Sequence, residues 1–396
     1  MVNRKVYFEK LIKLKDKQII KVVTGVRRCG KSTLLEMFRN YLLESGINKE
    51  QIISINFENL ENESLLDYKE LYKFIKDNLH KNKKTYIFLD EIQEVKNFQK
   101  VVDTLFLNPN NDIYITGSNA HMLSGELATL LSGRYIEIKM LPLSFKEYNE
   151  ILGGNIKENF NKYFINGGFP YATKLEDENI LKEYIEGIYN TVIIKDIAMR
   201  KKITDIPLLK NITKFVANSI GNILSSKKIA DYLTSSGRKT SHLTIDNYLE
   251  ALTESFIFYS VDRYDIKGKQ LLKSLNKYYL VDVGFRKIIS NDKKTDIGFV
   301  LENIVYLELI RRGYKVYVGK INDLEVDFIA EKGDDKIYIQ VSATIIDPNT
   351  FDREIRPLEK INDNYPKYII TMDELPLNKD GIKQINIIDF LMNEYI

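Results

Sequence analysis

The chain has 396 residues, too many for one ordinary hydrophobic core, so several domains are expected. With 44% hydrophobic and 29% charged residues, the composition is that of a globular protein and excludes a long disordered tract. The 58 basic and 55 acidic residues nearly cancel, so any nucleic-acid affinity would have to come from a local patch.

The sequence also limits the compartment and the metal chemistry. Neither the N-terminal segment nor any later window has the apolar length of a signal peptide or a membrane span, so we expect a cytoplasmic protein without a membrane partner. The single cysteine, Cys29, excludes an internal disulfide. With only 3 histidines, no structural metal is expected.

Strand-like and helix-like segments alternate over residues 1–150. The run QIIKVVT at 18–24 predicts a buried strand, and apolar residues recur at helical spacing from 31 to 43. Further strands are predicted at 52–57, 85–90, 112–117 and 135–140, with helical stretches near 64–80 and 96–107. Because strands that alternate with helices favour a parallel sheet with crossover connections, residues 1–150 are predicted to form an α/β domain.

Three further regions are predicted beyond residue 150. Residues 151–215 are mostly helical, as in a lid, and contain a Gly-Gly-Phe-Pro turn at 167–170. Residues 216–289 show three short helices followed by two strand-like runs, which is the outline of a winged helix-turn-helix. Residues 290–396 begin with a polar linker and continue with a helix and several strands, typical of a small α/β domain.

The segment GVRRCGKS at 25–32 matches the phosphate-binding pattern G-x-x-x-x-G-K-[ST] and lies between a predicted strand and a predicted helix. In this pattern the glycines let backbone N–H groups face phosphate oxygens, Lys31 neutralises the β and γ phosphates, and Ser32 ligates Mg²⁺. The sequence therefore predicts a P-loop NTPase core that binds ATP. The predicted nucleotide-binding residues are Gly25, Arg28, Cys29, Gly30, Lys31, Ser32, Thr33 and Asp90.

A predicted strand ends in Asp90 and Glu91. In P-loop enzymes such a strand end brings the first carboxylate to the Mg²⁺ shell and leaves the second beside the γ-phosphate, where it can deprotonate water. We therefore expect Ser32 and Asp90 to hold Mg²⁺ and Glu91 to be the catalytic base, which favours a hydrolase over a passive binder. The alternative is a strand that ends in two acids because acids suit the start of the following helix.

The next predicted strand and the one after it offer two further catalytic candidates. Asn119, preferred over Ser118, ends its strand where a polar side chain can reach the γ-phosphate or the attacking water, the role called sensor 1. Arg134 precedes the last core strand and is a candidate arginine finger for a neighbouring subunit. A turn-forming Asn and a surface Arg are the alternatives. For Arg27 and Arg28, within the loop, phosphate, a partner and solvent all stay open as contacts.

The chain resembles the AAA-type ATPases of bacteria and archaea that carry a C-terminal domain of unknown function. The resemblance rests on the segments GVRRCGKSTLL, ISINFEN, IFLDEIQ, ITGSNA, LLSGRY, LPLSFKEY and FINGGFPY. It covers essentially the whole chain, and the LPLSF-x-E-Y and GGFP segments are much narrower signatures than the phosphate loop. The resemblance implies an AAA-like core, a helical lid with a winged helix, and a C-terminal unit similar to PD-(D/E)XK nucleases.

The resemblance to PD-(D/E)XK nucleases points to Glu302, Asp327 and Gln340 as a degenerate nuclease site. Nucleases of that fold hold Mg²⁺ with a strand Asp and a Glu or Gln on the next strand, and a Lys two positions later assists the attacking water. Here Ser342 stands in place of that Lys, and Gln is a weaker Mg²⁺ ligand than Glu. We therefore favour a degenerate fold, kept for structure or for contacting DNA, over an active nuclease.

Charges around the predicted winged helix point in two directions. Basic residues lie before or at the start of the predicted recognition helix, where phosphate contacts are made. The same helix carries three acids, which oppose close approach to a phosphate backbone. DNA binding and a protein-interaction or lid role therefore both stay open. The basic residues are Lys227, Lys228, Arg238, Lys239 and His242, and the acids are Asp246, Glu250 and Glu254.

Three functions follow from these features. The first is Mg²⁺-dependent ATP hydrolysis coupled to rearrangement of the C-terminal modules, with DNA as a candidate target. The second is a nucleotide-gated switch or scaffold in signalling or defence, in which ATP governs partner binding and turnover is slight. The third is ATP-regulated DNA cleavage. ATP and Mg²⁺ are the expected ligands, while DNA, a protein partner and a homo-oligomer stay open as further partners.

Overall fold

The structure, a computed structural model, describes residues 4–119, 131, 133–290 and 297–393. The chain divides into two compact units, each with its own β-sheet. The first unit comprises Met1–Pro142 and Glu254–Phe256, and the second comprises Leu143–Thr253 and Ile257–Ile396. Within the described ranges, no helix combines the length and the apolar character needed to cross a bilayer.

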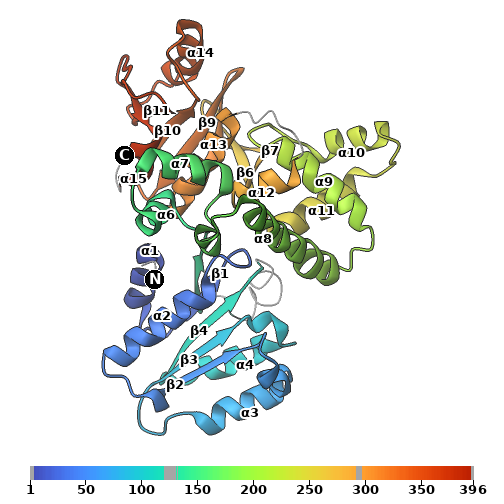
Figure 1. Cartoon of the computed structure of the whole chain (residues 1–396), viewed down its shortest axis with the longest axis vertical. Helices are drawn as coiled ribbons and strands as arrows, with labels where there is room; N and C mark the ends of the chain where they lie inside the picture. Colours follow the sequence, from blue (N-terminus) through green and yellow to red (C-terminus); the bar gives the residue numbers. More distant parts are fainter. Residues whose placement is uncertain (1–3, 120–130, 132, 291–296, 394–396) are drawn as a thin grey trace. The chain divides into compact units, whose positions relative to one another are not determined.

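The first unit is a sheet flanked by helices (Figure 1). Its strands are ordered β2-β3-β4-β1-β5, and every neighbouring pair is parallel, which confirms the predicted α/β core. The strands are β1 (Ile20–Thr24), β2 (Ile52–Asn56), β3 (Thr85–Asp90), β4 (Asn111–Gly117) and β5 (Tyr135–Lys139). The helices are α1 (Lys5–Leu14), α2 (Lys31–Glu44), η1 (Lys49–Gln51), η2 (Leu60–Leu66), α3 (Tyr68–Asn78), η3 (Ile92–Glu94) and α4 (Phe98–Phe106).

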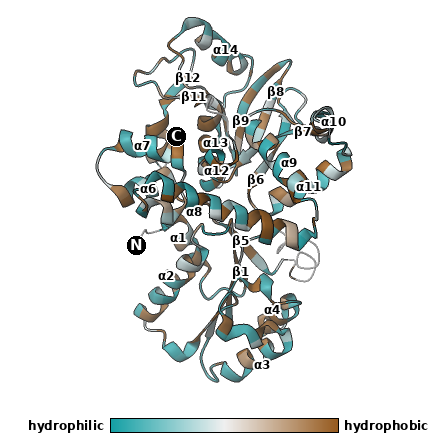
Figure 2. Cartoon of the chain, turned by 45° about the vertical axis from the view of Figure 1, so that its right-hand side comes forward, coloured by the Kyte–Doolittle hydropathy of each residue, from teal (hydrophilic) through white to brown (hydrophobic). Residues whose placement is uncertain are grey.

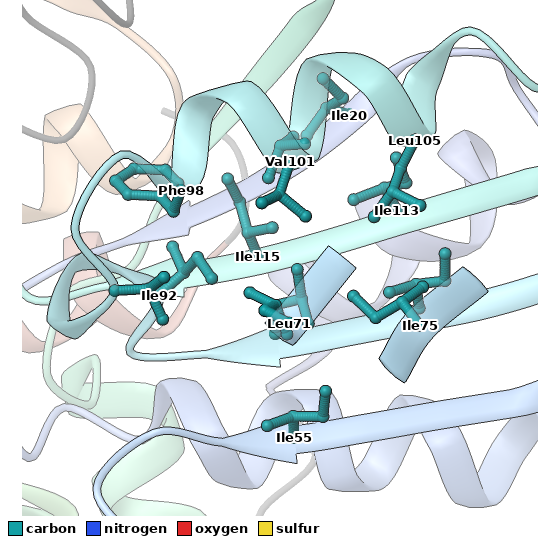
Figure 3. Close-up of a cluster of buried hydrophobic side chains, with 14 of the residues drawn as sticks. Ile20, Ile55, Leu71, Ile75, Ile92, Phe98, Val101, Leu105, Ile113 and Ile115 are labelled. Carbon is teal, nitrogen blue, oxygen red and sulfur yellow. The ribbon is translucent and has the colours of Figure 1, made fainter. Parts of the chain in front are cut away.

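One face of this sheet forms a hydrophobic core with helices α3 and α4. Figure 3 shows Leu71 and Ile75 of α3 and Val101 of α4 over the sheet, near Ile113 and Ile115 of β4. All five side chains are buried. Because burying one such side chain contributes about 1.5–3 kcal/mol, this face fixes the sheet whose strand ends carry the predicted site.

The other face of the sheet packs against α2 through aromatic rings. The ring centroid of Phe38 on α2 lies 5.2 Å from that of Tyr114 on β4, and Tyr114 stacks on Phe88 of β3 at 4.8 Å. The rings of Phe8 on α1 and Phe38 form an edge-to-face contact, with their centroids 6.0 Å apart. Since α2 begins directly after the glycine-containing loop, this packing sets the position of the helix start relative to the strand ends.

Helices dominate the first half of the second unit, as the sequence pattern predicts. Figure 2 shows hydrophilic and hydrophobic residues side by side on most helices, the pattern of helices that are buried on one side only. Helix α8 continues without a break into a π-helix, η6. The elements are α6 (Phe145–Leu152), α7 (Ile156–Asn166), η5 (Pro170–Lys174), α8 (Glu178–Thr191), η6 (Val192–Met199), α9 (Ile206–Asn218), α10 (Ser226–Ser235) and α11 (His242–Glu254).

The second half of this unit holds a seven-stranded mixed sheet of order β12-β11-β10-β9-β8-β6-β7. Strands β6 and β7 form an antiparallel hairpin, and β6 pairs in parallel with β8, so the predicted wing and the C-terminal strands share one sheet. The strands are β6 (Phe258–Asp265), β7 (Gln270–Leu280), β8 (Lys315–Ile321), β9 (Leu324–Lys332), β10 (Asp335–Val341), β11 (Lys367–Thr371) and β12 (Ile382–Asn386). The helices are α12 (Gly284–Ile289), α13 (Ile297–Arg311), α14 (Pro348–Glu359) and α15 (Ile387–Met392).

A buried carboxylate holds the Gly-Gly-Phe-Pro turn that follows α7. Asp282 accepts hydrogen bonds from the backbone N–H of Gly168 at 2.7 Å and of Gly284 at 2.8 Å. Gly167 has a φ of +76°, and a Cβ there would lie only 1.7 Å from Asp282 Oδ1, so the position requires glycine. Burial raises the pKa of Asp282 to about 7, although the two N–H donors oppose the shift. The turn thus ties α7 to the start of α12.

Candidate nucleotide-binding site

Two glycines shape the loop between β1 and α2. Gly30 has a φ of +104° directly before α2, and a Cβ on Gly25 would lie 2.1 Å from the carbonyl oxygen of Met140. Neither position therefore accepts another residue without strain. Between them Arg28 is exposed, whereas Cys29 is buried, and burial raises the pKa of its thiol. A buried, protonated thiol suits a small filler residue.

Lys31, the first residue of α2, is buried with its ammonium group fully surrounded by acceptors. It donates to the Gly25 carbonyl oxygen and to Ser118 Oγ, each at 3.0 Å, and lies 3.4 Å from Glu91 Oε1. Burial alone would lower the pKa of Lys31, but the surrounding groups, Glu91 first and Asp90 among them, together outweigh burial and raise it. The ammonium group is therefore charged, as phosphate binding requires.

Glu91 lies opposite Lys31, at the carboxyl end of β3. The Ser118 hydroxyl is 2.8 Å from both carboxylate oxygens, and Gln93 Nε2 donates to Oε2 at 2.5 Å. Burial alone would raise the pKa of Glu91, but Lys31 together with the hydrogen bonds of Gln93 and Ser118 lowers it to about 2. The carboxylate is therefore ionised and held by three neighbours.

The order of the strands explains why these side chains meet. Because β4 lies between β1 and β3, its carboxyl end places Ser118 between Lys31 and Glu91. Asn119, which the sequence analysis preferred as the sensor, follows Ser118 and is also buried. Which of these two residues lies between Lys31 and Glu91 depends on the order of the strands. The residues that follow a single strand do not reveal that order.

The two predicted Mg²⁺ ligands lie together. Asp90 accepts hydrogen bonds from Thr116 Oγ1 at 2.5 Å and from Asn56 Nδ2 at 3.2 Å. Burial raises the pKa of Asp90, while hydrogen bonds from Thr116 and Ser32 oppose the shift. A hydroxyl and a carboxylate side by side offer the oxygen atoms that Mg²⁺ prefers, so the residues present fit the ion.

The remaining predicted residues lie around this centre or apart from it. Thr33 is exposed on the first turn of α2. Arg134 forms an ion pair with Asp103 of α4, and its guanidinium lies 5.6 Å from the ring centroid of Phe106. The Arg134 side chain remains 40% exposed, so a neighbouring molecule can reach it.

Arg4 supports the loop but was not found by sequence reasoning. Its buried guanidinium donates to the carbonyl oxygens of Cys29 at 3.3 Å and Leu141 at 2.5 Å, and lies 5.1 Å from the ring centroid of Tyr7. Arg4 therefore links the phosphate-binding loop to the residues that follow β5. A basic residue beside an amphipathic helix carries no signal that separates it from a surface charge.

Comparison with known proteins finds relatives that match the chain along nearly its whole length. An uncharacterized protein of Haemophilus influenzae is 41% identical to it, with 99% of each chain covered. The chain belongs to that protein's family. Another member of this family, an uncharacterized protein of Methanocaldococcus jannaschii, is 33% identical over 98% of this chain and 93% of its own.

Family models and solved structures define the domain type of this family member. A model described as an AAA domain matches residues 17–149, and one described as a domain of unknown function (DUF8612) matches residues 157–296. The Walker-type ATPase of Pyrococcus abyssi, 16% identical, shares the fold with a TM-score of 0.51 over 73% of this chain and 96% of its own. Residues 17–149 therefore match an AAA domain, and the first unit has the fold of a P-loop NTPase, which implies nucleotide binding.

The three residues of the predicted degenerate nuclease site also come together, in the second unit. Glu302 on α13, Asp327 on β9 and Gln340 on β10 are buried, and Gln340 Oε1 accepts from the Asp327 N–H at 3.2 Å. Lys277 of β7 lies among them, 2.9 Å from Glu302 Oε1 and 3.7 Å from Asp327 Oδ1. Burial alone would lower the pKa of Lys277, but the surrounding carboxylates raise it.

The nuclease pattern places this lysine two positions after Gln340, where the chain has Ser342. The structure brings one from β7, a strand in another region of the sequence. The available signal was a lysine that opens the apolar run KYYLVDV at 277–283. The likeness of this unit to nucleases stays a prediction.

Proposed function

We propose that the chain is a Mg²⁺-dependent ATPase in which Glu91 activates the attacking water. The observation that carries the proposal is the hydrogen-bonded set of Lys31, Ser118 and Glu91, with Ser118 Oγ 3.0 Å from Lys31 and 2.8 Å from Glu91. A positioned base next to the phosphate-binding lysine is the arrangement that hydrolysis needs. Membership of the AAA domain family supports nucleotide binding.

In this proposal each part of the site has one task. The Lys31 ammonium and the N–H groups at the start of α2 bind the β and γ phosphates. Ser32 and Asp90 would hold Mg²⁺, which when bound neutralises phosphate charge. Ser118 or Asn119 senses the γ-phosphate.

ATP binding would also change the basicity of Glu91. A γ-phosphate competes with Glu91 for the Lys31 ammonium, which lies 3.4 Å from the carboxylate in this structure. When Lys31 turns to phosphate, Glu91 loses a main cause of its low pKa, while the burial that raises the pKa remains. Glu91 therefore becomes a stronger base when the substrate is in place.

Steady-state hydrolysis by wild type, Lys31→Ala and Glu91→Gln tests the proposal, with ATP affinity measured by calorimetry. We expect Lys31→Ala to lose binding and turnover together. Glu91→Gln should bind ATP normally and turn over at least roughly 100-fold more slowly, the usual effect of losing a general base. Wild-type turnover no higher than that of Glu91→Gln would rule out this ATPase mechanism.

That last outcome would select the second candidate, a nucleotide-gated switch with slight turnover. The observation that favours it is the engagement of the Glu91 carboxylate by Lys31, Ser118 and Gln93, which withholds the base from water unless ATP displaces Lys31. Tight ATP binding combined with negligible turnover is its signature.

We further propose that ATP controls the helical and mixed-sheet elements of the second unit, with DNA as the candidate partner. Lys227 and Lys228 on α10 and Lys239 before α11 are exposed, whereas Arg238 is paired with Asp205 at 2.5 Å. ATPase rates with and without duplex DNA, together with a low-salt gel-shift assay, test this part. An unchanged rate and no retention would leave a protein partner as the target.

A further inference from the structure

The ammonium group of Lys277 supplies the positive charge in a buried cluster of carboxyl groups. The Lys277 side chain is 2% exposed, and its Nζ lies 2.6 Å from Glu325 Oε1, 2.9 Å from Glu302 Oε1 and 3.7 Å from Asp327 Oδ1. Three carboxylates from α13 and β9 therefore surround one ammonium group. Glu302 and Asp327 are themselves buried, and burial raises the pKa of both carboxyl groups, so a negative charge on either needs a cation inside the protein.

The carboxylate oxygens are also occupied on their other sides. Tyr279 donates its hydroxyl to Glu302 Oε1 at 2.6 Å, and the N–H of Val341 donates to Asp327 Oδ2 at 2.8 Å. The second oxygen of Glu302 faces Gly221, where even a Cβ would lie 2.7 Å from it. Few lone pairs remain that could turn toward an additional ion.

Gln340, the third predicted ligand, is committed as well. Its Oε1 accepts from the Asp327 N–H at 3.2 Å, and its Nε2 donates to Glu354 Oε2 at 3.0 Å. Over the described ranges of the chain, no group of three or more His, Cys, Asp or Glu side chains is arranged so that it could hold a metal ion. The cluster is thus arranged around an ammonium group.

We propose that the Lys277 ammonium is the resident cation of this cluster, that it occupies the place a divalent cation would need between Glu302 and Asp327, and that the cluster is therefore a closed, non-cleaving site. Replacing Lys277 with a neutral side chain of similar length removes the ammonium group and leaves the carboxylates without a cation. Because uncompensated buried charges are strongly unfavourable, the uncovered cluster gains affinity for a divalent cation with oxygen preference.

Manganese titration of the nucleotide-free full-length protein tests the proposal. Every protein carries Asp90→Asn, which removes the proposed Mg²⁺-binding carboxylate at the end of β3. The set comprises this background alone and with Lys277→Met, Lys277→Arg, Asp327→Asn, or Lys277→Met plus Asp327→Asn. Calorimetry gives the Mn²⁺ affinity, and circular dichroism confirms that each variant is folded.

We expect Lys277→Met to bind Mn²⁺ at least roughly tenfold more tightly than the background and to lose that gain with Asp327→Asn. Lys277→Arg should behave as the background, because it keeps a cation in place. Mn²⁺ binding by the background that disappears with Asp327→Asn would overturn the proposal, as would a folded Lys277→Met variant with no gain.

A second measurement decides the matter if Lys277→Met does not fold. The wild-type chain is incubated with supercoiled plasmid, ATP and Mn²⁺ or Mg²⁺, beside Asp327→Asn. Intact plasmid in both supports a closed site. Nicking by wild type that Asp327→Asn abolishes would show an open metal site and overturn the proposal.

Discussion

At the scale of single residues, Ser118 links the phosphate-binding lysine to the proposed catalytic base. Its hydroxyl is 3.0 Å from Lys31 Nζ and 2.8 Å from both oxygens of Glu91, so it controls where each group points. We predict that Ser118→Ala lowers the turnover number by roughly 100-fold, the lower end of the effect of removing one positioned hydrogen-bond donor at a reacting centre. ATP affinity, measured by calorimetry, should change only slightly.

Asn119→Ala is the matched control, since Asn119 is the next residue and equally buried. If Ser118 is the sensor, the control variant keeps its turnover within a few-fold of wild type. A larger loss in Asn119→Ala than in Ser118→Ala would assign the sensor role to Asn119 instead.

At the scale of elements, the joint between α7 and α12 depends on a glycine that faces a carboxylate. A Cβ on Gly167 would lie 1.7 Å from Asp282 Oδ1, and Asp282 cannot retreat without losing its bonds to Gly168 and Gly284. We predict that Gly167→Ala lowers the free energy of unfolding by about 3 kcal/mol or more, measured by urea denaturation.

Gly153 supplies the control for backbone strain. Its φ of +63° and ψ of −169° lie close to the +76° and −166° of Gly167, but no atom lies within 4 Å of the position its Cβ would take. Gly153→Ala should therefore cost roughly 1–3 kcal/mol, the strain of an alanine in this backbone region, and less than Gly167→Ala. Equal losses in the two variants would mean that the contact with Asp282 carries no weight.

The same carboxyl group predicts a pH dependence of stability. Burial raises the pKa of Asp282 from 3.8 to about 7, so between these values the folded chain holds a proton that the unfolded chain releases. The free energy of unfolding therefore falls as pH rises from about 4 to 7, by about 1.4 kcal/mol for each unit that the pKa is raised. Asp282→Asn removes this dependence.

Urea midpoints of wild type and Asp282→Asn at several pH values check the prediction. The stability of wild type relative to Asp282→Asn should decrease steadily toward neutral pH and then level off. A difference that stays constant from pH 4 to 8 would show that Asp282 has the same pKa in the folded and unfolded chain.

At the scale of the whole molecule, the sequence predicted those strands and helices that a local residue pattern determines. The strand before Gly25, the helix from Lys31 and the strand that ends at Asp90 each follow from a short run of residues, and the parallel core is confirmed. The contact of Ser118 with Glu91 depends on strand order, and that of Lys277 with Glu302 depends on the packing of helix α13 against strand β7. Such long-range choices leave no mark in a local pattern.

A single chain does not show whether subunits assemble. The effect of Arg134 on the turnover of a neighbouring subunit can be measured to test assembly. Within the chain Arg134 pairs with Asp103, yet its side chain is 40% exposed. If Arg134 acts on the ATP of a neighbouring subunit, Arg134→Ala lowers turnover at least roughly 100-fold while ATP affinity is kept, because arginine fingers contribute about 10³–10⁵ to the rate. Asp103→Ala, which removes the pairing but keeps the arginine, should not reduce turnover.

Mixing two inactive variants separates action between subunits from action within one. Lys31→Ala lacks the phosphate-binding lysine but keeps Arg134, and Arg134→Ala has the opposite defect. Mixed assemblies then contain sites in which an intact loop meets an intact arginine, so the mixture should hydrolyse ATP faster than the sum of its components. A mixture no faster than that sum would place the role of Arg134 within its own chain, where its pairing with Asp103 already holds it.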